Sequence, residues 1–360
     1  MVFDPTQPHD DLPYLPPRED LETKAVLKRA LTASRAVAEL KGAGGLIPDQ
    51  AILINAIPLQ EAKLSSEIEN IVTTQDELFR AMLDEKGGAN PHAREVLRYR
   101  TALRQGYEAL ATRPLSLDLL REVCATIRDE PVRFRSATNR VFIGNRATGR
   151  ITYTPPTGGR PLLRRLRNLE SYLLASEGPD PLIRMAVSHY QFEAIHPFTD
   201  GNGRTGRILN ILYLLHAGIL DIPVLYLSRF FMQDKPQYYR RLRAVTEKGE
   251  WEAWLVYMLQ GLEETAIWTT GRIRAIGDLL GATVERCRRE IPKVYSKELV
   301  DLIFRLPYCK ISFVVDAGIA KRQAASEYLQ ELERIGVLAG EKRGREVVYR
   351  HPALVKVLAE

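Results

Sequence analysis

The stretch FEAIHPFTDGNGRTGRILN, from Phe192 to Asn210, decides the fold and the chemistry that we expect of this chain. PLIRMAVSHYQFEAI, which leads into it, has apolar residues at helical spacing, and RILNILYLLHAGIL, which follows, is apolar nearly all round. The motif is therefore predicted to be a loop between two helices. Gly201 and Gly203 lack side chains, so their N–H groups and those opening the next helix form an anion site. Arg204 and Arg207 add guanidinium groups that suit phosphate oxygens, which indicates a polyphosphate ligand.

Metal-binding and basic groups stand beside this predicted anion site. Asp200 and Asn202 offer oxygen ligands, and one aspartate is enough for magnesium, which also takes substrate phosphates and waters. His196 titrates near neutrality and is a candidate general base toward an attacking hydroxyl. The motif thus predicts phosphoryl or nucleotidyl transfer.

Plainer interpretations exist for each part of the motif. A glycine-rich loop is often only a tight connection, an arginine pair is usually solvated, and a lone histidine is more often structural. Their combination favours a ligand site. The spacing differs from the P-loop pattern GxxxxGK[ST] and follows a helix, so neither a P-loop nor a dinucleotide fold explains it.

Composition sets the outer limits of the fold. A chain of 360 residues with 45% hydrophobic content is expected to form one main globular domain with smaller attachments. We expect no membrane span and a cytoplasmic location, because the sequence lacks an apolar run of about 20 residues and a signal peptide. Cys124, Cys287 and Cys309 lack metal-ligand spacing and suit a reducing compartment. A net charge of +6 argues only weakly for an anionic partner.

The composition and the spacing of apolar residues along the chain predict a mainly α protein divided into four parts. We expect an extended arm at 1–20, a helical region at 21–120, a helical core at 121–285 and a small unit at 286–360. Within the core, VRFRSATNRVFIGNRATGRITYTPPTGG, from Val132 to Gly159, alternates apolar and polar residues around a turn-forming GNRATG. This pattern predicts a β-hairpin or flap.

The segment HPFTDGNGRTGR, from His196 to Arg207, matches the signature HPFxDGNGRxxR in full and so resembles the Fic proteins. That family has an all-helical fold and moves AMP from ATP onto a hydroxyl side chain of a target protein. The resemblance extends roughly from Leu12 to Leu262 and includes LPP at Leu15 to Pro17. It implies His196 as the base, Asp200 as the ligand of Mg²⁺, and Arg204 and Arg207 as contacts of the β and γ phosphates. The nucleotide-binding residues that it implies are Glu69, His196, Gly201, Asn202, Gly203, Arg204, Thr205, Gly206, Arg207, Tyr238 and Tyr239.

Two further segments take roles from the same resemblance. The flap residues Val141, Phe142, Ile143 and Gly144 would hold a segment of the target protein by strand addition. Tyr238 and Tyr239 would lie near the adenine, although two aromatic residues packed in a helical core explain the pair equally well.

An upstream segment, AKLSSEIENIVTT, resembles the inhibitory motif [ST]xxxE[GN] of some Fic proteins through Ser65, Glu69 and Asn70. The resemblance implies that Glu69 pairs with Arg207 and occupies the guanidinium needed by the γ phosphate. In some relatives the same glutamate also supports removal of AMP. The alternative is that Ser66 and Glu69 form a capping box that starts a helix.

The C-terminal unit is predicted to be a small winged helix. SKELVDLIFRL indicates a first helix, KISFVVDAG and KRQAASEYLQELERIG a helix-turn-helix, and VLAGEKRGREVVYRH a two-stranded wing with Lys342, Arg343 and Arg345 at its tip. From Glu285 onward, 15 Lys and Arg stand against 11 Asp and Glu, a net charge of +4. This excess leaves DNA binding, protein contact and dimerisation open.

Two functions from different classes follow. The first is a protein adenylyltransferase that uses ATP and Mg²⁺ to modify Tyr, Thr or Ser of a target protein or of itself, and that Glu69 inhibits. The second is a DNA-binding regulator whose Fic core senses a nucleotide. His196 favours the enzyme, because a sensor needs no base.

Overall fold

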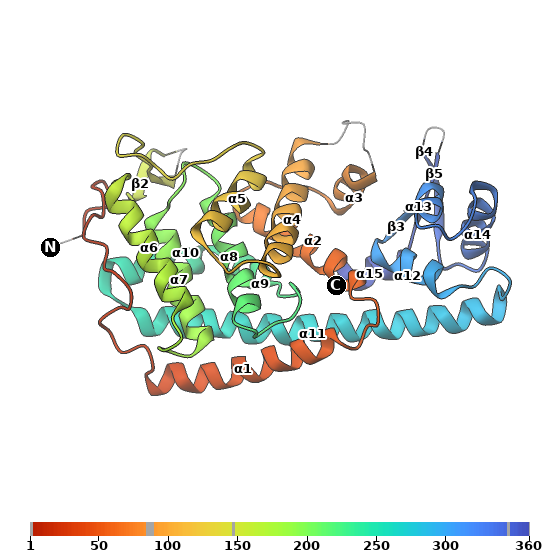
Figure 1. Ribbon diagram of the computed structural model, residues 1–360, viewed down its shortest axis with the longest axis horizontal. Coiled ribbons are helices and arrows are strands. Elements are labelled where there is room, and N and C mark those ends of the chain that lie inside the picture. The colour runs from red at the N-terminus through yellow and green to blue at the C-terminus, as the bar shows by residue number, and fades with distance from the viewer. Residues whose placement is uncertain (1–2, 84–89, 146–147, 344–345, 360) are drawn as a thin grey trace. The chain divides into compact units, whose positions relative to one another are not determined.

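The computed structural model describes residues 3–83, 90–145, 148–343 and 346–359, and most of these residues are helical (Figure 1). The chain forms two compact units. The first contains Met1–Ala38 and Glu61–Ala266, and the second contains Glu39–Gln60 and Ile267–Glu360. The mainly α fold predicted from the sequence is confirmed.

Three helices have residues in both units: α1 (Lys24–Gly44), α2 (Ala51–Ile68) and α11 (Trp251–Glu290). The other helices of the first unit are α3 (Gln75–Leu83), α4 (Pro91–Leu110), α5 (Leu117–Arg128), α6 (Arg160–Leu174), α7 (Pro181–Ile195), α8 (Asn202–His216), α9 (Leu227–Gln233) and α10 (Lys235–Lys248).

Helices α7 and α8 form the centre of the first unit. Every residue of α7 except Pro181 and Glu193 is buried, so this helix is covered by the protein on all sides. Asp180 caps its start, because its carboxylate accepts a hydrogen bond from the N–H of Leu182. Helix α7 packs against α6 and α8, and α8 packs against α4 and α5. The loop between α7 and α8 therefore rests on a closely packed base.

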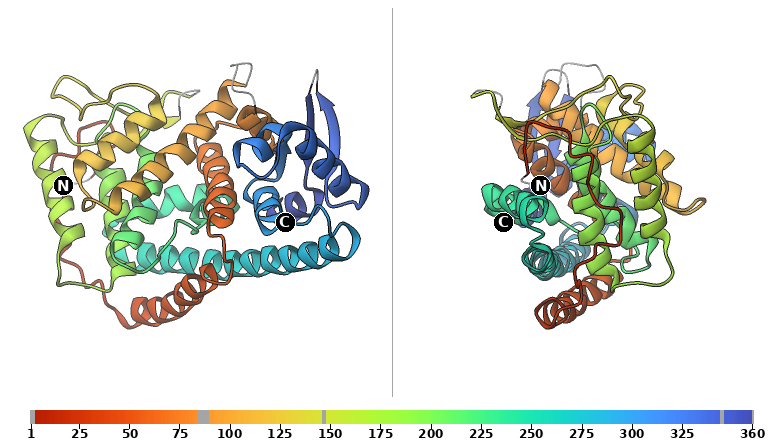
Figure 2. Two further views of the ribbon diagram at one scale, coloured as in Figure 1. Left: turned by 45° about the vertical axis from the view of Figure 1, so that its right-hand side comes forward. Right: turned by 90° about the vertical axis from the view of Figure 1, so that its left-hand side faces the viewer.

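The N-terminal arm packs on the first unit. Leu12 and Leu15 are buried, and Asn168 of α6 bonds both the N–H and the carbonyl of Leu15. Gln191 of α7 donates to the carbonyl of Pro13 at 2.8 Å. Figure 2 shows the arm, in dark red, running along these helices. Its fixed path comes from buried leucines and backbone hydrogen bonds, since it has no regular secondary structure.

The predicted hairpin is present. Strand β1 (Ile143–Asn145) pairs antiparallel with β2 (Arg150–Tyr153), and Ile143 faces Tyr153. Residues 146–147 lie outside the described part. Phe142, just before β1, is 51% exposed, so a large apolar side chain stands on the surface at this hairpin.

The capping-box interpretation of Ser66 and Glu69 is wrong, because a helix ends here. Helix α2 runs up to Ile68, and Asn70 follows with φ of 65°. The N–H of Ile71 donates to the carbonyl of Ser66 at 3.0 Å, which closes the last turn around Asn70. Asn or Gly at this position suits the left-handed conformation that the turn needs.

The second unit contains every element expected of its C-terminal part. Helices α12 (Lys297–Arg305), α13 (Ile311–Asp316) and α14 (Arg322–Arg334) precede strands β4 (Ala339–Arg343) and β5 (Glu346–Arg350), which pair antiparallel. A short strand β3 (Tyr308–Lys310) joins the sheet in the order β3-β5-β4, and α15 (Pro352–Ala359) ends it; neither element was predicted. Arg345 and the side chain of Arg343 lie outside the described residues.

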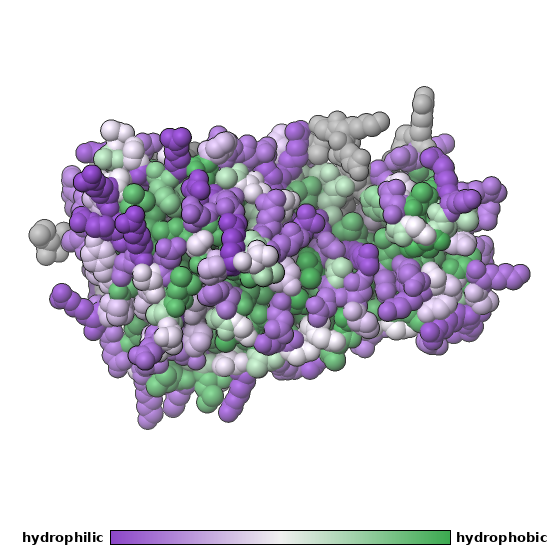
Figure 3. Space-filling view, viewed as in Figure 1, coloured by the Kyte–Doolittle hydropathy of each residue, from purple (hydrophilic) through white to green (hydrophobic). Residues whose placement is uncertain are grey.

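The described helices include none that is both long enough and apolar enough to cross a bilayer. Hydrophilic side chains are spread widely over the face shown in Figure 3, as the 27% of charged residues leads one to expect.

Candidate active site

The loop between α7 and α8 takes its shape from two left-handed residues. His196 ends α7 with φ of 49°, and Gly201 precedes α8 with φ of 83°. Between them the side chain of Asn202 closes the loop, because its amide accepts from the N–H of Phe198 at 2.8 Å and donates to the carbonyl of Phe198 at 2.9 Å. Asn202 is only 2% exposed. The side chain of Asn202 thus braces the loop, and its expected role as an oxygen ligand stays a prediction.

The first turn of α8 lies where the sequence predicts an anion site, and phosphate binding there stays a prediction. Its first backbone N–H groups have no acceptor within the helix, and the helix dipole favours negative charge there. A Cβ on Gly203 would overlap Oε1 of Glu69, so only glycine lets this carboxylate approach the turn. The chain therefore already places an anion, its own Glu69, at the N-terminus of α8.

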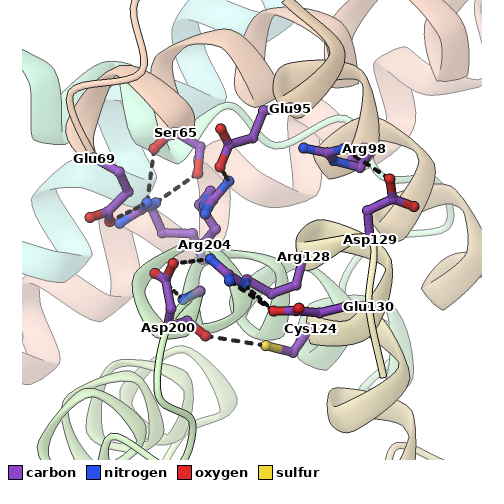
Figure 4. Close-up of polar contacts among 12 residues, drawn as sticks. Ser65, Glu69, Glu95, Arg98, Cys124, Arg128, Asp129, Glu130, Asp200 and Arg204 are labelled. Carbon is purple, nitrogen blue, oxygen red and sulfur yellow. Dashed lines mark hydrogen bonds and ion pairs between the residues drawn. The ribbon is translucent and has the colours of Figure 1, made fainter. Parts of the chain in front are cut away.

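Arg207 binds the end of α2 through three hydrogen bonds (Figure 4). Its Nε donates to Oγ of Ser65 at 2.7 Å, and its Nη2 donates to the carbonyl of Ser65 and to Oε1 of Glu69, both at 2.8 Å. The Arg207 side chain is 3% exposed and that of Glu69 is 34% exposed. The pair expected from the sequence is thus present, with the arginine buried and the glutamate half-buried. Asn70 lies outside it and accepts from Lys235.

Arg204 is also held by a carboxylate, which the sequence did not predict. Its Nη1 donates to Oε1 of Glu95, on α4, at 2.6 Å, and the Arg204 side chain is 3% exposed. Figure 4 shows Glu95 reaching Arg204, whereas Glu69 lies in another part of the site. Both motif arginines are therefore charge-compensated.

Thr205 and Gly206 face inward. The N–H of Thr205 donates to the carbonyl of Gly201 at 3.0 Å, and its side chain is fully buried. A Cβ on Gly206 would overlap the carboxyl of Glu193, so this glycine permits close packing of α8 on α7. The N–H of Thr205 is used within the helix, and the expected nucleotide contact of this residue stays a prediction.

His196 is held as a neutral imidazole. Burial lowers its pKa to about 4, and the positive charge of Arg135 acts in the same direction. A neutral ring has a nitrogen lone pair free to accept a proton at physiological pH. One turn earlier, burial raises the pKa of the Glu193 carboxyl to about 7, because its charged form is poorly solvated between α7 and α8.

Asp200 lies at the open side of the loop, with its side chain 56% exposed. Its Oδ1 accepts from the N–H of Gly201 at 2.6 Å, and its Oδ2 is paired with Arg128 of α5. The described residues contain no group of three His, Cys, Asp or Glu side chains placed to hold a metal. This single accessible carboxylate fits an ion that obtains its other ligands from phosphates and water.

The two tyrosines of α10 differ in position. Tyr238 is 1% exposed, stacks on Phe231 and bonds Nε2 of His189 at 2.8 Å. This packing favours the core alternative, and its contact with an adenine stays a prediction. Tyr239 is 41% exposed, and its placement near an adenine stays a prediction.

Two family models match parts of the chain. The model of the Fic/DOC family N-terminal region matches residues 27–108, and that of the C-terminal domain of SoFic-like protein adenylyltransferases matches residues 279–354.

Curated relatives match a shorter part of their own length. The protein adenylyltransferase fic-1 of Caenorhabditis elegans is 27% identical over 148 residues, which cover 40% of this chain and 26% of the relative. Protein adenylyltransferase Fic of Nematostella vectensis is 35% identical over 116 residues, 31% of this chain and 23% of the relative. The matches thus span about a quarter of the length of these relatives.

A solved structure covers nearly the whole chain. A Fic family protein from Desulfovibrio desulfuricans superposes with a TM-score of 0.58 at 19% identity, over 94% of this chain and 98% of that one. This likeness shows the shared fold. The intact loop and the two family models agree with this fold, and they make the chain similar to Fic proteins in sequence as well.

Proposed function

We propose that this protein transfers AMP from ATP to a hydroxyl side chain of a protein, and that Glu69 restrains the reaction. The observation that carries the proposal is the carboxylate of Glu69 beside Gly203 and Arg207, because an anion already occupies the positive end of α8. The relatives named protein adenylyltransferase support the same activity.

In the proposed reaction a Tyr, Thr or Ser hydroxyl oxygen attacks the α phosphorus of ATP. A bond forms from that oxygen to phosphorus, the bond from phosphorus to the oxygen bridging to the β phosphate breaks, and pyrophosphate leaves with the electron pair. His196 takes the hydroxyl proton on its neutral imidazole. The N–H groups opening α8 and the guanidinium of Arg207 bind phosphate oxygens.

Asp200 would hold magnesium in this reaction. The ion would neutralise phosphate charge, and the exposed carboxylate is suited to it. Arg128 pairs with the same carboxylate, so we propose that this ion pair loosens when the ion binds and leaves a carboxylate oxygen of Asp200 for it.

Glu69 restrains transfer by competing with the γ phosphate for Arg207. With Arg207 bound to Ser65 and Glu69, ATP binds without its γ phosphate held, and the α phosphorus is not aligned for attack. The opposite reaction, removal of AMP from a modified protein, uses the same groups and is the alternative direction.

The hairpin would bind the target protein. Strand β1 is short and pairs with β2, and Phe142 stands exposed before it. An extended segment of the target would add to this strand through backbone hydrogen bonds, which tolerate varied sequences.

The DNA-binding alternative has less support. Helix α14, which stands where a winged helix would present its reading helix, carries Glu327, Glu331 and Glu333 against Arg322 and Arg334. Contacts with DNA phosphates need more basic than acidic side chains on this helix. We therefore propose a winged-helix unit used for protein contact, including contact with a second copy of this chain.

We also propose the cytoplasm as the location of this protein. All three cysteines are free and buried, as suits a reducing compartment.

One experiment tests the activity directly. The protein is incubated with magnesium and ATP labelled at the α or the γ phosphorus, and label attached covalently to protein is measured after denaturing electrophoresis. The proposal expects α label only. Attachment of the γ label would refute nucleotidyl transfer in favour of phosphoryl transfer.

A further inference from the structure

Arg135, which precedes the hairpin in sequence, binds the end of α7 with its side chain. It is 3% exposed, and its described hydrogen bonds all end on backbone carbonyls. Nε donates to the carbonyl of His196 at 2.7 Å, and Nη2 donates to the carbonyl of Ile195 at 3.1 Å. Nη2 also reaches Pro156 at 2.9 Å, and Nη1 reaches Asn139 at 3.3 Å.

The backbone of Arg135 adds two more links. Its N–H donates to the carbonyl of Pro197 at 2.9 Å, and its carbonyl accepts from the N–H of Gly159 at 2.8 Å. One residue thus ties the carbonyls of Ile195, His196 and Pro197 to both ends of the segment that carries the hairpin.

These contacts satisfy carbonyl groups at the end of α7, where the backbone has few hydrogen-bond partners of its own. The last carbonyls of a helix lack N–H donors within the helix, and those of Ile195 and His196 are of this kind. His196 itself is left-handed, with φ of 49°, a conformation unfavourable for a residue with a Cβ. The planar fork of a guanidinium satisfies two such carbonyls at once, which a lysine cannot do.

We propose that Arg135 is a positioning residue for His196: it fixes the backbone of the base and couples that backbone to the hairpin that binds the target. The proposal rests on the proposed function for the role of His196 as base and for the binding of the target at the hairpin. A target segment that orders the hairpin would then also restrict the backbone of His196, because Arg135 contacts both His196 and the hairpin segment at Asn139 and Pro156.

The charge of Arg135 has a second effect on the imidazole. Burial is the main cause of the lowered pKa of His196, and Arg135 lowers it further. Glu69 and Asp200 raise it, as does a contact with the backbone carbonyl of Glu193. Arg135 thus adds to the effect of burial on the pKa of His196 and opposes the effect of the nearby acids.

The test uses Arg135→Lys and Arg135→Gln in a Glu69→Gly background, with Arg165→Lys as matched control. Arg165 is 6% exposed and also donates to backbone carbonyls, those of Asp10, Leu12 and Pro161, away from His196. Labelling rates give kcat and KM for ATP, and NMR of labelled histidine follows the titration of His196 without ATP.

For Arg135→Lys we expect kcat to fall about 30- to 100-fold with KM for ATP within about twofold, because the fork is lost while the phosphate site is intact. The His196 titration should stay low in Arg135→Lys, which keeps the charge, and rise in Arg135→Gln. The control should lose stability without losing kcat.

An Arg135→Lys variant with wild-type kcat, or one that loses no more activity than Arg165→Lys, overturns the proposal. If the parent protein labels nothing, the proposed function fails, yet the two His196 titrations still decide the role of Arg135. If Arg135→Gln does not fold, the kcat of Arg135→Lys against its control decides it alone.

Discussion

Replacing Glu69 with glycine should release Arg207 and accelerate transfer of AMP. The pair joins a buried guanidinium, 3% exposed, to a carboxylate that is 34% exposed, at 2.8 Å. A charge-assisted hydrogen bond contributes about 1.5–3 kcal/mol, and partial exposure of Glu69 reduces this to about 1–2 kcal/mol. If ATP must break the contact before reacting, its removal raises the rate about 5- to 30-fold. Ser65 continues to hold Arg207 in the variant, so the guanidinium stays in place.

The assay is the initial rate of self-labelling from ATP labelled at the α phosphorus, with melting temperature measured in parallel. Glu67→Gly is the matched control: it removes a glutamate from the same helix end, and Glu67 is not among the described contacts of Arg207. Ser66→Ala is a second control, because the Ser66 hydroxyl has no partner in the described structure. A folded Glu69→Gly protein that labels no faster than wild type, or no faster than Glu67→Gly, would refute the reasoning.

Four further predictions follow from the site. His196→Ala should lower labelling at least about 100-fold while equilibrium ATP binding changes less than about twofold; unchanged labelling removes it as the base. Asp200→Ala should raise the magnesium concentration for half-maximal labelling about tenfold or more, and an unshifted titration argues against a ligand role. Burial raises the pKa of Glu193 from 4.5 to about 7, so the folded state holds this proton more tightly than the unfolded state does, and stability falls as pH rises from 4.5 to about 7. Glu193→Gln should make the melting temperature depend less on pH over this range, and a pH dependence equal to that of wild type contradicts this. Glu95→Gln should lower the free energy of unfolding by about 1–2 kcal/mol, because buried Arg204 loses its counter-charge, and equal urea midpoints would show that the pair contributes little.

The sequence predicts the parts of this site whose residues are neighbours in the chain. Glycines at 201 and 203 and the apolar segments around them specify a loop that opens a helix, and the structure has that loop. The pairing of Glu69 with Arg207 was predictable only through a family resemblance, since 138 residues separate them. Local rules also allowed a capping box at Ser66, because they do not show where the preceding helix ends.

The remaining contacts come from packing, for which one sequence carries no signal. Glu95, Arg128 and Arg135 reach the loop from α4, α5 and the segment before the hairpin, and nothing near them in sequence marks them as site residues. Tyr238 and Tyr239 illustrate the same limit at short range. They are neighbours, yet helical geometry turns them about 100° apart, so one is in the core and the other at the surface.

The two arginine–carboxylate pairs differ in how readily ATP displaces the carboxylate. Glu69 follows the last residue of α2, beside the left-handed Asn70, so it leaves Arg207 with little loss of helical hydrogen bonding. Glu95 lies inside α4, between Pro91 and Leu110, and moving it disturbs a helix that packs on α8. In the proposed reaction, a phosphate that enters the first turn of α8 would therefore compete with Glu69, while Arg204 would keep its counter-charge. Arg207 can thus be released to bind a phosphate, whereas Arg204 stays paired with Glu95. For this reason the restraint should depend on Glu69 and not on Glu95.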